Sequence, residues 1–190
     1  GTGGAIGITG DVYATAVFDP DGPGPETPQL IVGGEFVSAG GVNCNNIARW
    51  DGLTWYPLGG AGANGVLGGG TGSPPRVYAL ASFDPDGNGP ARPQLIVSGR
   101  FNTAGGVACN SIARWDGSAW LPLLGSSGGN GMPNEEVLAL AVYDPDADGP
   151  AAAELIAGGG FNIAGGVQCK NISRWNGSTW APLPGLPGTN

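Results

Sequence analysis

The sequence contains no histidine. This absence removes the commonest general base, the Ser-His-Asp and Cys-His catalytic pairs, and the zinc and copper sites built on imidazole. The acidic residues sit mainly in repeated loops, and no two of them stand in an apolar setting as a carboxylate pair that hydrolyses a glycosidic bond would. We therefore expect a protein that is not an enzyme.

Basic residues are also scarce: seven Lys and Arg stand against 15 Asp and Glu, giving a formal net charge of −8. A chain without a basic stripe offers no surface to phosphate backbones or anionic lipid, so nucleic acid is not an expected partner. No run approaches the roughly 20 apolar residues of a membrane-crossing helix, so no membrane insertion is expected. Hydrophobic residues still make up 41% of the chain, which is enough for a packed core.

Glycine and proline are abundant, at 39 and 17 residues, and most of them recur at fixed places in an internal repeat. The repeats align without a gap and comprise residues 11–59, 76–124 and 136–184. Units that repeat at about 60 residues stack on their neighbours and share one continuous core. We therefore interpret residues 1–190 as a single repeat domain with connectors at 60–75 and 125–135, whose different lengths are typical of surface loops.

The second repeat shows the strand pattern most clearly. Residues 77–83 alternate with a period of two and carry apolar residues on both faces, as a strand between two layers does. Shorter strands are predicted at 95–97, 111–115 and 120–123. Asp116-Gly117, between the last two, is the strongest short signal for a hairpin turn. Each repeat is therefore predicted to be a four-stranded antiparallel unit.

Tryptophans flank these hairpin turns in pairs, and we expect them to be cross-strand or diagonal neighbours in the core. The pairs are Trp50 with Trp55, Trp115 with Trp120, and Trp175 with Trp180. The alternative for one exposed Trp per repeat is a platform for sugar stacking. An arginine precedes each pair, and we expect a structural role for it, stacking on a Trp or pairing with a loop carboxylate. These arginines are Arg49, Arg114 and Arg174.

The three cysteines, Cys44, Cys109 and Cys169, occupy the same position in each repeat. Equivalent positions of successive repeats are expected to lie farther apart than the roughly 4.4–6.8 Å Cα spacing of a disulfide. Three buried thiols are therefore predicted. The alternative is that they bridge separate chains in an oxidising compartment.

The order of these motifs resembles the kelch repeat. A diglycine closes the second strand, an aromatic residue precedes the turn, and a Trp opens the fourth strand, most fully in Ile31-Val32-Gly33-Gly34 with Trp50 and Trp55. The second repeat departs by having Ser98-Gly99, and Trp replaces the family's usual Tyr before the turn. The repeats look closest to secreted bacterial kelch-like propellers with Gly-Gly-x-Phe and Ala-Gly-Gly-Val motifs.

The resemblance implies an all-β fold, a β-propeller in which each of the three repeats is one four-stranded blade, and an extracellular or cell-surface location. The alternative fold is a β-trefoil, whose units are shorter and lack the diglycine and double-Trp pattern. Kelch propellers commonly bind other proteins, and the copper oxidase among them uses histidines that this chain lacks.

Three blades cannot close a ring, because propellers typically have about four to eight. We therefore expect either that two chains pair into a six-bladed ring or that the chain is part of a longer one. A head-to-tail contact that does not close would give a filament. The predicted function is a non-catalytic structural or interaction module that completes its ring or a filament by self-association.

The loop after the first strand carries the only ligand-like cluster in the sequence. It follows the first half of the D-x-[DN]-x-[DN]-G calcium pattern, in which three side-chain oxygens converge on one hard cation. The candidate ligands are Asp84, Asp86 and Asn88 in the second repeat and Asp144, Asp146 and Asp148 in the third. The first repeat keeps Asp19 and Asp21 but has Pro23 in the third place.

This loop also resembles the calcium-binding hairpins of the integrin alpha-subunit propeller, without their Asp at the ninth position, where Arg92 and Ala152 stand. The glutamate that closes an EF-hand loop is absent too, since Leu95 and Leu155 occupy that place. The plainer interpretation is a turn in which Asp caps its own backbone and Pro presets φ. A calcium-dependent adhesion or carbohydrate-binding propeller is the alternative function.

Overall fold

The computed structural model describes residues 7–59, 64–69, 73–87, 89–125, 128–133, 135–146 and 151–183. Within these ranges the protein is all-β and is built of several antiparallel sheets, with no helix. The described ranges accordingly hold no helix of the length and apolarity needed to cross a membrane.

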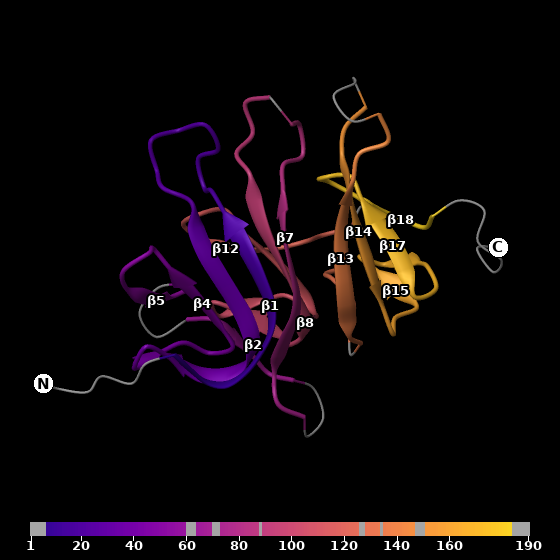
Figure 1. The fold of residues 1–190 in the computed structure, drawn as a ribbon. Helices are drawn as coiled ribbons and strands as arrows, with labels where there is room; N and C mark the ends of the chain where they lie inside the picture. Colours follow the sequence, from indigo (N-terminus) through magenta and orange to yellow (C-terminus); the bar gives the residue numbers. More distant parts are fainter. Residues whose placement is uncertain are drawn as a thin grey trace, which may run out of the picture.

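Each repeat forms one antiparallel sheet in which the main strands lie side by side in sequence order (Figure 1). The first sheet consists of β1 (Ile8–Phe18), β2 (Gln29–Ala39), β4 (Ile47–Trp50) and β5 (Trp55–Pro57), with β3 (Val42–Asn43) paired to β2. The second sheet consists of β7 (Arg76–Phe83), β8 (Gln94–Arg100), β11 (Ile112–Trp115) and β12 (Trp120–Pro122). The third sheet consists of β13 (Val137–Tyr143), β14 (Glu154–Gly159), β17 (Ile172–Trp175) and β18 (Trp180–Ala181).

The diglycine motif marks a break in register at the same place in every sheet. The pairing of β1 with β2 shifts between Val12 and Ala14, opposite Gly34 and Gly33. A Cβ on the second glycine would overlap a backbone carbonyl of the adjacent strand, that of Asp11 for Gly34 and that of Arg76 for Gly99. The second glycine is therefore needed for close backbone approach, which explains why the second repeat keeps it and has Ser in the first place.

Short strands lie beside the three sheets. They are β9 (Thr103–Ala104) with β10 (Val107–Ala108), β15 (Ile163–Ala164) with β16 (Val167–Gln168), and β6 (Val66–Leu67), which pairs with β9. The strand pattern predicted none of them, and β8 also continues to Arg100, beyond the predicted end of the second strand. Val66 of the first connector is fully buried, so this connector contributes to the core as well as joining two repeats.

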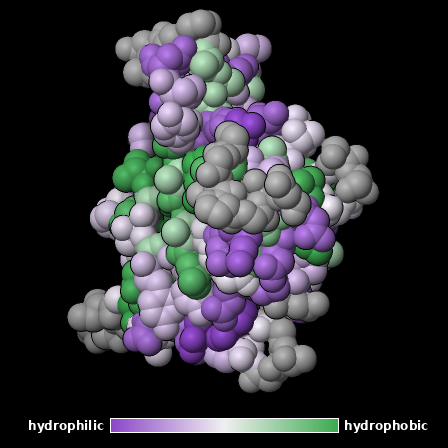
Figure 2. Space-filling model, turned by 90° about the vertical axis from the view of Figure 1, so that its right-hand side faces the viewer, coloured by the Kyte–Doolittle hydropathy of each residue, from purple (hydrophilic) through white to green (hydrophobic). Residues whose placement is uncertain are grey.

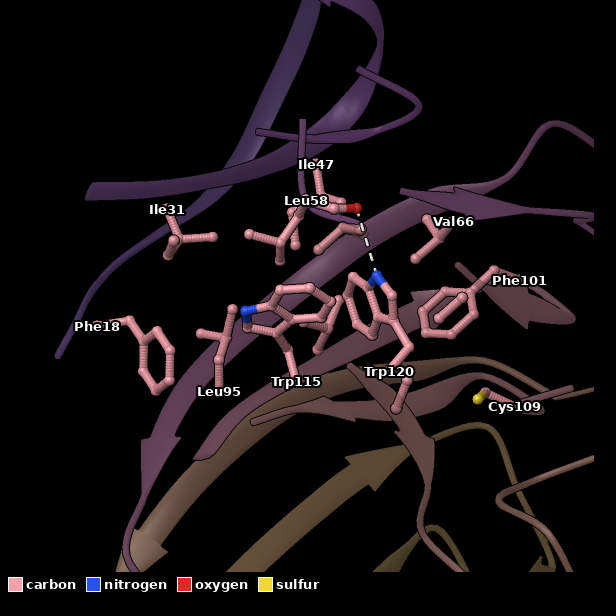
Figure 3. Close-up of a cluster of buried hydrophobic side chains, with 14 residues drawn as sticks. Phe18, Ile31, Ile47, Leu58, Val66, Leu95, Phe101, Cys109, Trp115 and Trp120 are labelled. Atoms are coloured by element: carbon pink, nitrogen blue, oxygen red, sulfur yellow. Dashed lines mark hydrogen bonds between the residues drawn. The ribbon is translucent and has the colours of Figure 1, made fainter. Parts of the chain in front are cut away.

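The three sheets stand next to one another through their first strands, β1 beside β7 and β7 beside β13 (Figure 1). The two largest hydrophobic clusters lie between successive sheets and draw residues from both. Figure 3 shows the first of them, where Trp115 and Trp120 of the second sheet lie among Ile31, Leu58 and Val66 of the preceding repeat and connector.

The predicted tryptophan pairs are confirmed as direct cross-strand neighbours in each sheet. Their ring centroids are 5.4–6.4 Å apart. The second and third pairs are buried, whereas Trp50 and Trp55 of the first sheet are only partly buried. All three cysteines are buried and unpaired, as the favoured interpretation of their spacing predicted.

Candidate interaction surfaces

One inter-sheet contact is made twice, first between the first and second sheets and again between the second and third. In each case a tryptophan of the following sheet donates its indole N–H to a leucine carbonyl of the preceding repeat. The Trp120 Nε1 to Leu58 O distance is 3.3 Å, and the Trp180 Nε1 to Leu123 O distance is 3.4 Å. Since these residues are equivalent in the repeat, the chain uses one sheet-to-sheet interface rather than two unrelated ones.

At one end of this contact, the Asp-Pro-Asp loop of one repeat packs against the hairpin turn of the next. A Cβ built on Gly117 would lie 3.0 Å from Cβ of Pro20, and one built on Gly177 would lie 3.0 Å from Cβ of Pro85. Glycine in the Asp-Gly and Asn-Gly turns therefore serves two purposes: it provides the positive φ of the turn, and it leaves room for the proline of the preceding loop.

Two ion pairs lie at the other end of the same contact. Arg76 of the second sheet pairs with Glu35 of the first at 2.5 Å, and Arg100 of the second pairs with Glu136 of the third at 2.8 Å. Equivalent positions carry opposite charges in the two pairs, because Glu35 corresponds to Arg100 and Arg76 corresponds to Glu136. Their side chains are partly exposed, so each is expected to contribute at most about 1 kcal/mol and to matter more for register than for stability.

In the described part of the chain, no sheet covers the outer side of the first sheet, where half of this interface lies. The uncovered residues, which we call the first-sheet face, are Val12, Leu30, Trp50 and Trp55. Val12 is 45% exposed, whereas its equivalents Val77 and Val137 are fully buried between sheets. Leu30 is partly exposed where Leu95 and Leu155 are buried. Behind this face a smaller buried cluster, with Phe36 and Cys44 among its members, corresponds to half of the larger clusters.

Likewise, no sheet of the described residues covers the outer side of the third sheet, where the complementary half of the interface lies. The residues, which we call the third-sheet face, are Tyr143, Ile156, Ile172 and Leu183. Tyr143 is 54% exposed, whereas its equivalents Phe18 and Phe83 are 1% and 0% exposed. Figure 2 views the molecule from this side and shows hydrophobic residues gathered among hydrophilic ones. A soluble protein rarely leaves such an apolar sheet face in water unless it serves an interaction.

The predicted calcium ligands lie on the loops that follow β1, β7 and β13, and their carboxylates bind backbone N–H groups. In each loop the first Asp accepts a hydrogen bond from the N–H of the second, at 3.4, 3.2 and 3.2 Å. The second Asp accepts from an N–H five residues later. These bonds join Asp21 to Glu26, Asp86 to Ala91, and Asp146 to Ala151 at 3.0–3.1 Å.

Asn88 and Asp148 lie outside the described residues. Among the residues that are described, no three His, Cys, Asp or Glu side chains gather closely enough to hold a metal ion. Partial burial raises the pKa of Asp84, and the neighbouring Asp86 carboxylate acts in the same direction. The described geometry is that of a capped turn, and calcium binding stays a prediction.

The recurring arginines bind the start of the neighbouring strand. Arg49 donates to Gln29 Oε1 at 3.2 Å and Arg114 to Gln94 Oε1 at 3.1 Å. Arg174 forms an ion pair of 2.9 Å with the equivalent Glu154. The partner is therefore a strand residue, neither a Trp nor a loop carboxylate, because the side chain crosses directly to the paired strand. Arg49 also lies over the Tyr56 ring, 4.8 Å from its centroid.

The three cysteine thiols are buried in the described part of the chain. Burial raises the pKa of all three, to about 11 for Cys109, so the thiols stay protonated at neutral pH.

Comparisons with protein-family models, curated proteins and solved structures found no match. The two sheet faces and the residues that recur in the repeats are therefore the features that point to a function.

Proposed function

We propose that the three sheets are blades of a kelch-like β-propeller and that the chain is a non-catalytic, extracellular structural or interaction module. The all-β fold supports this proposal, as does the order of four antiparallel strands in each repeat. The neighbouring first strands β1, β7 and β13 agree with it, since the blades of a propeller surround a common channel. The polar residues at notable positions recur in every repeat and bind backbone or neighbouring strands, which favours structural over catalytic roles.

The observation that carries the proposal is the inter-sheet contact itself. It is made twice inside the chain, and its two halves are left uncovered on the outermost sheets. A propeller closes by making this one contact all the way around, and three blades are fewer than the roughly four to eight that do so. The functional assembly is therefore larger than three sheets, and self-association into a ring or filament completes it.

The test is the native mass of the purified chain, measured by sedimentation together with images of the particles by negative-stain electron microscopy. Self-association predicts the mass of two or more whole chains, and particles shaped as rings or filaments. The mass of one chain at all concentrations, with no assembled particles, would contradict self-association.

The second candidate is a calcium-dependent adhesion or carbohydrate-binding propeller. Two carboxylates two residues apart recur on the same loop of all three sheets, and this repetition is the feature that favours it. A glycan array probed with and without calcium tests the carbohydrate part. Binding that requires calcium and depends on Asp144 and Asp146 would favour this candidate over a purely structural module.

A further inference from the structure

We propose that the first-sheet face of this chain binds the third-sheet face of a second copy, and that the reciprocal contact closes the two copies into a head-to-tail pair of six sheets. The inference rests on the proposed function and names the partner and the contact residues. Six sheets fall within the range in which propellers close, and two identical contacts related by a twofold axis complete the ring without leaving a free face.

Val12 and Gly158 are the equivalents of Val77 and Gly33, two residues that pack against each other inside the chain. Inside the chain, the side chain of Val77 occupies the space beside Gly33, where a Cβ would overlap it. Gly158 is the equivalent of Gly33, yet a Cβ built there would meet no heavy atom of the described residues nearer than 3.8 Å. Val12 is the equivalent of Val77 and is 45% exposed. The third sheet therefore has an open slot and the first sheet has the residue that fills it.

The other inter-sheet contacts also have their equivalents on the two outer faces. Trp55 is the equivalent of Trp120, and Leu183 is the equivalent of Leu58, whose carbonyl accepts the Trp120 indole N–H. A second copy would let Trp55 donate to Leu183 in the same way. At the end where loop and hairpin turn meet, Pro145 and Gly52 are equivalent to Pro20 and Gly117, which pack against each other.

Gly7 and Ile8 occupy the place that connector residues have in front of the other two sheets. The Gly7 carbonyl accepts a hydrogen bond from Gly40 N at 2.8 Å. Gly65 and Gly131 of the two connectors accept from the equivalent glycines, also at 2.8 Å. Ile8 thus stands where Val66 and Met132 are fully buried. Ile8 therefore provides the first-sheet face with the residue that a connector provides between the other sheets. A sheet equivalent to the third is the remaining part that a complete interface needs.

The two faces differ, and this difference sets the orientation. Two first-sheet faces would bring two Val12 side chains together, and two third-sheet faces would leave two slots at Gly158 unfilled. Only the head-to-tail arrangement pairs each side chain with a slot. The ion-pair positions at this junction carry Asp11 and Gly160, the equivalents of Arg76 and Glu35. These two positions therefore provide neither an ion pair nor like-charge repulsion, and apolar contact is the main interaction proposed for this junction.

The experiment blocks each face separately. Val12→Asp places a carboxylate on the first-sheet face, and Tyr143→Asp places one on the third-sheet face. Both residues are half-exposed in the single chain, so each variant is expected to fold. Matched controls on the same strands are Val17→Asp and Val142→Asp. Their equivalent in the middle sheet, Ser82, stays exposed although both of its neighbours are present.

Sedimentation of wild-type chain is expected to give twice the single-chain mass, independent of salt. Each face variant alone is expected to sediment as a single chain, and each control as the wild-type pair. An equimolar mixture of the two face variants, examined at high concentration, is expected to form pairs again, because one junction is intact between them. Circular dichroism of every variant verifies that it has folded.

The possible failures are distinguishable. A wild-type protein that sediments as a single chain overturns both this inference and the proposed self-association. A wild-type assembly that Val12→Asp and Tyr143→Asp leave intact overturns the assigned faces and leaves the proposed function standing. A mixture that stays as single chains overturns the head-to-tail arrangement, and a wild-type mass series above two copies overturns closure into a pair.

Discussion

Replacing Trp120 by alanine is expected to destabilise the chain by about 3–5 kcal/mol, because the indole fills the contact between the first and second sheets. Trp120 is only 5% exposed. Its removal leaves a cavity between two sheets and takes the donor away from the Leu58 carbonyl. For a chain of this length, 1 kcal/mol corresponds to about 2–4 °C, so Tm is expected to fall by about 6–20 °C.

The packing and hydrogen-bonding contributions can be separated with Trp120→Phe. This variant keeps an aromatic ring but loses the N–H, and the lost hydrogen bond is expected to account for about 0.5–1.5 kcal/mol of its cost. Urea denaturation followed by far-UV circular dichroism is the suitable assay, since tryptophan fluorescence would itself change with the substitution.

The repeat supplies a control for this prediction. Trp55 has the same position in the first sheet, but no preceding sheet of the same chain covers it, and it is partly exposed. In a Val12→Asp background that prevents pairing, Trp55→Ala is expected to cost less than half as much as Trp120→Ala. Equal losses at the two positions would refute the reasoning, because the cost would then arise within each sheet and not between sheets.

Three further predictions concern glycine, pH and calcium. Gly159→Ala is expected to cost about 1–3 kcal/mol in urea denaturation because its Cβ would overlap the Glu136 carbonyl, whereas Gly160→Ala, with open space around it, should be neutral or slightly stabilising. The free energy of unfolding is expected to fall between about pH 9 and pH 11. The pKa of the Cys109 thiol is 9.0 in the unfolded chain and is raised to about 11 in the folded protein. In this range the unfolded state binds fewer protons than the folded state, so a rise in pH favours unfolding. Denaturation at several pH values should show a smaller alkaline loss for Cys109→Ala than for wild type. Millimolar calcium is expected to leave Tm unchanged, because the loop carboxylates already accept backbone N–H groups; a rise in Tm that Asp144→Asn abolishes would instead favour the calcium site.

Features with a local cause were predictable from the sequence. The four strands of each repeat follow from period-two alternation and from the Asp-Gly or Asn-Gly turn, and the Trp pairing follows from its spacing around that turn. The short strands β9 and β10 were missed because two-residue strands give no periodicity. The buried Val66 was missed because it stands in a Gly-rich connector, although an apolar residue follows Asn-Gly in both connectors and could have signalled it.

Features that depend on the direction of a side chain were not predictable. The structural role of Arg49 was expected, but its partner Gln29 lies across a strand pair that spacing alone does not specify. The aspartate spacing is shared by calcium loops and capped turns, and only the direction of each carboxylate separates them. Half-exposure of Val12 could not be predicted either, since the Val-Tyr-Ala sequence at Val12 is repeated at the fully buried Val77.

In a chain that repeats itself, the positions at which the repeats differ carry the specific information. The inter-sheet ion pairs are such positions, because Glu35 meets Arg76 and Arg100 meets Glu136. Exchanging the order of the sheets would bring Glu35 to Glu136, and like charges at that distance oppose contact. The charges are therefore matched to the order of the sheets that the covalent chain sets.

The outer faces carry no such pair of opposite charges, because Gly160 and Asp11 occupy the positions equivalent to those of the inter-sheet ion pairs. If a second copy binds there, as we propose, apolar contact of the kind that the chain makes twice between its own sheets would hold it. A contact held by apolar burial, without an ion pair, should weaken little as salt rises. It should also be weaker than the internal contacts, so a pair held by one junction should need a higher chain concentration to form than a closed pair held by two.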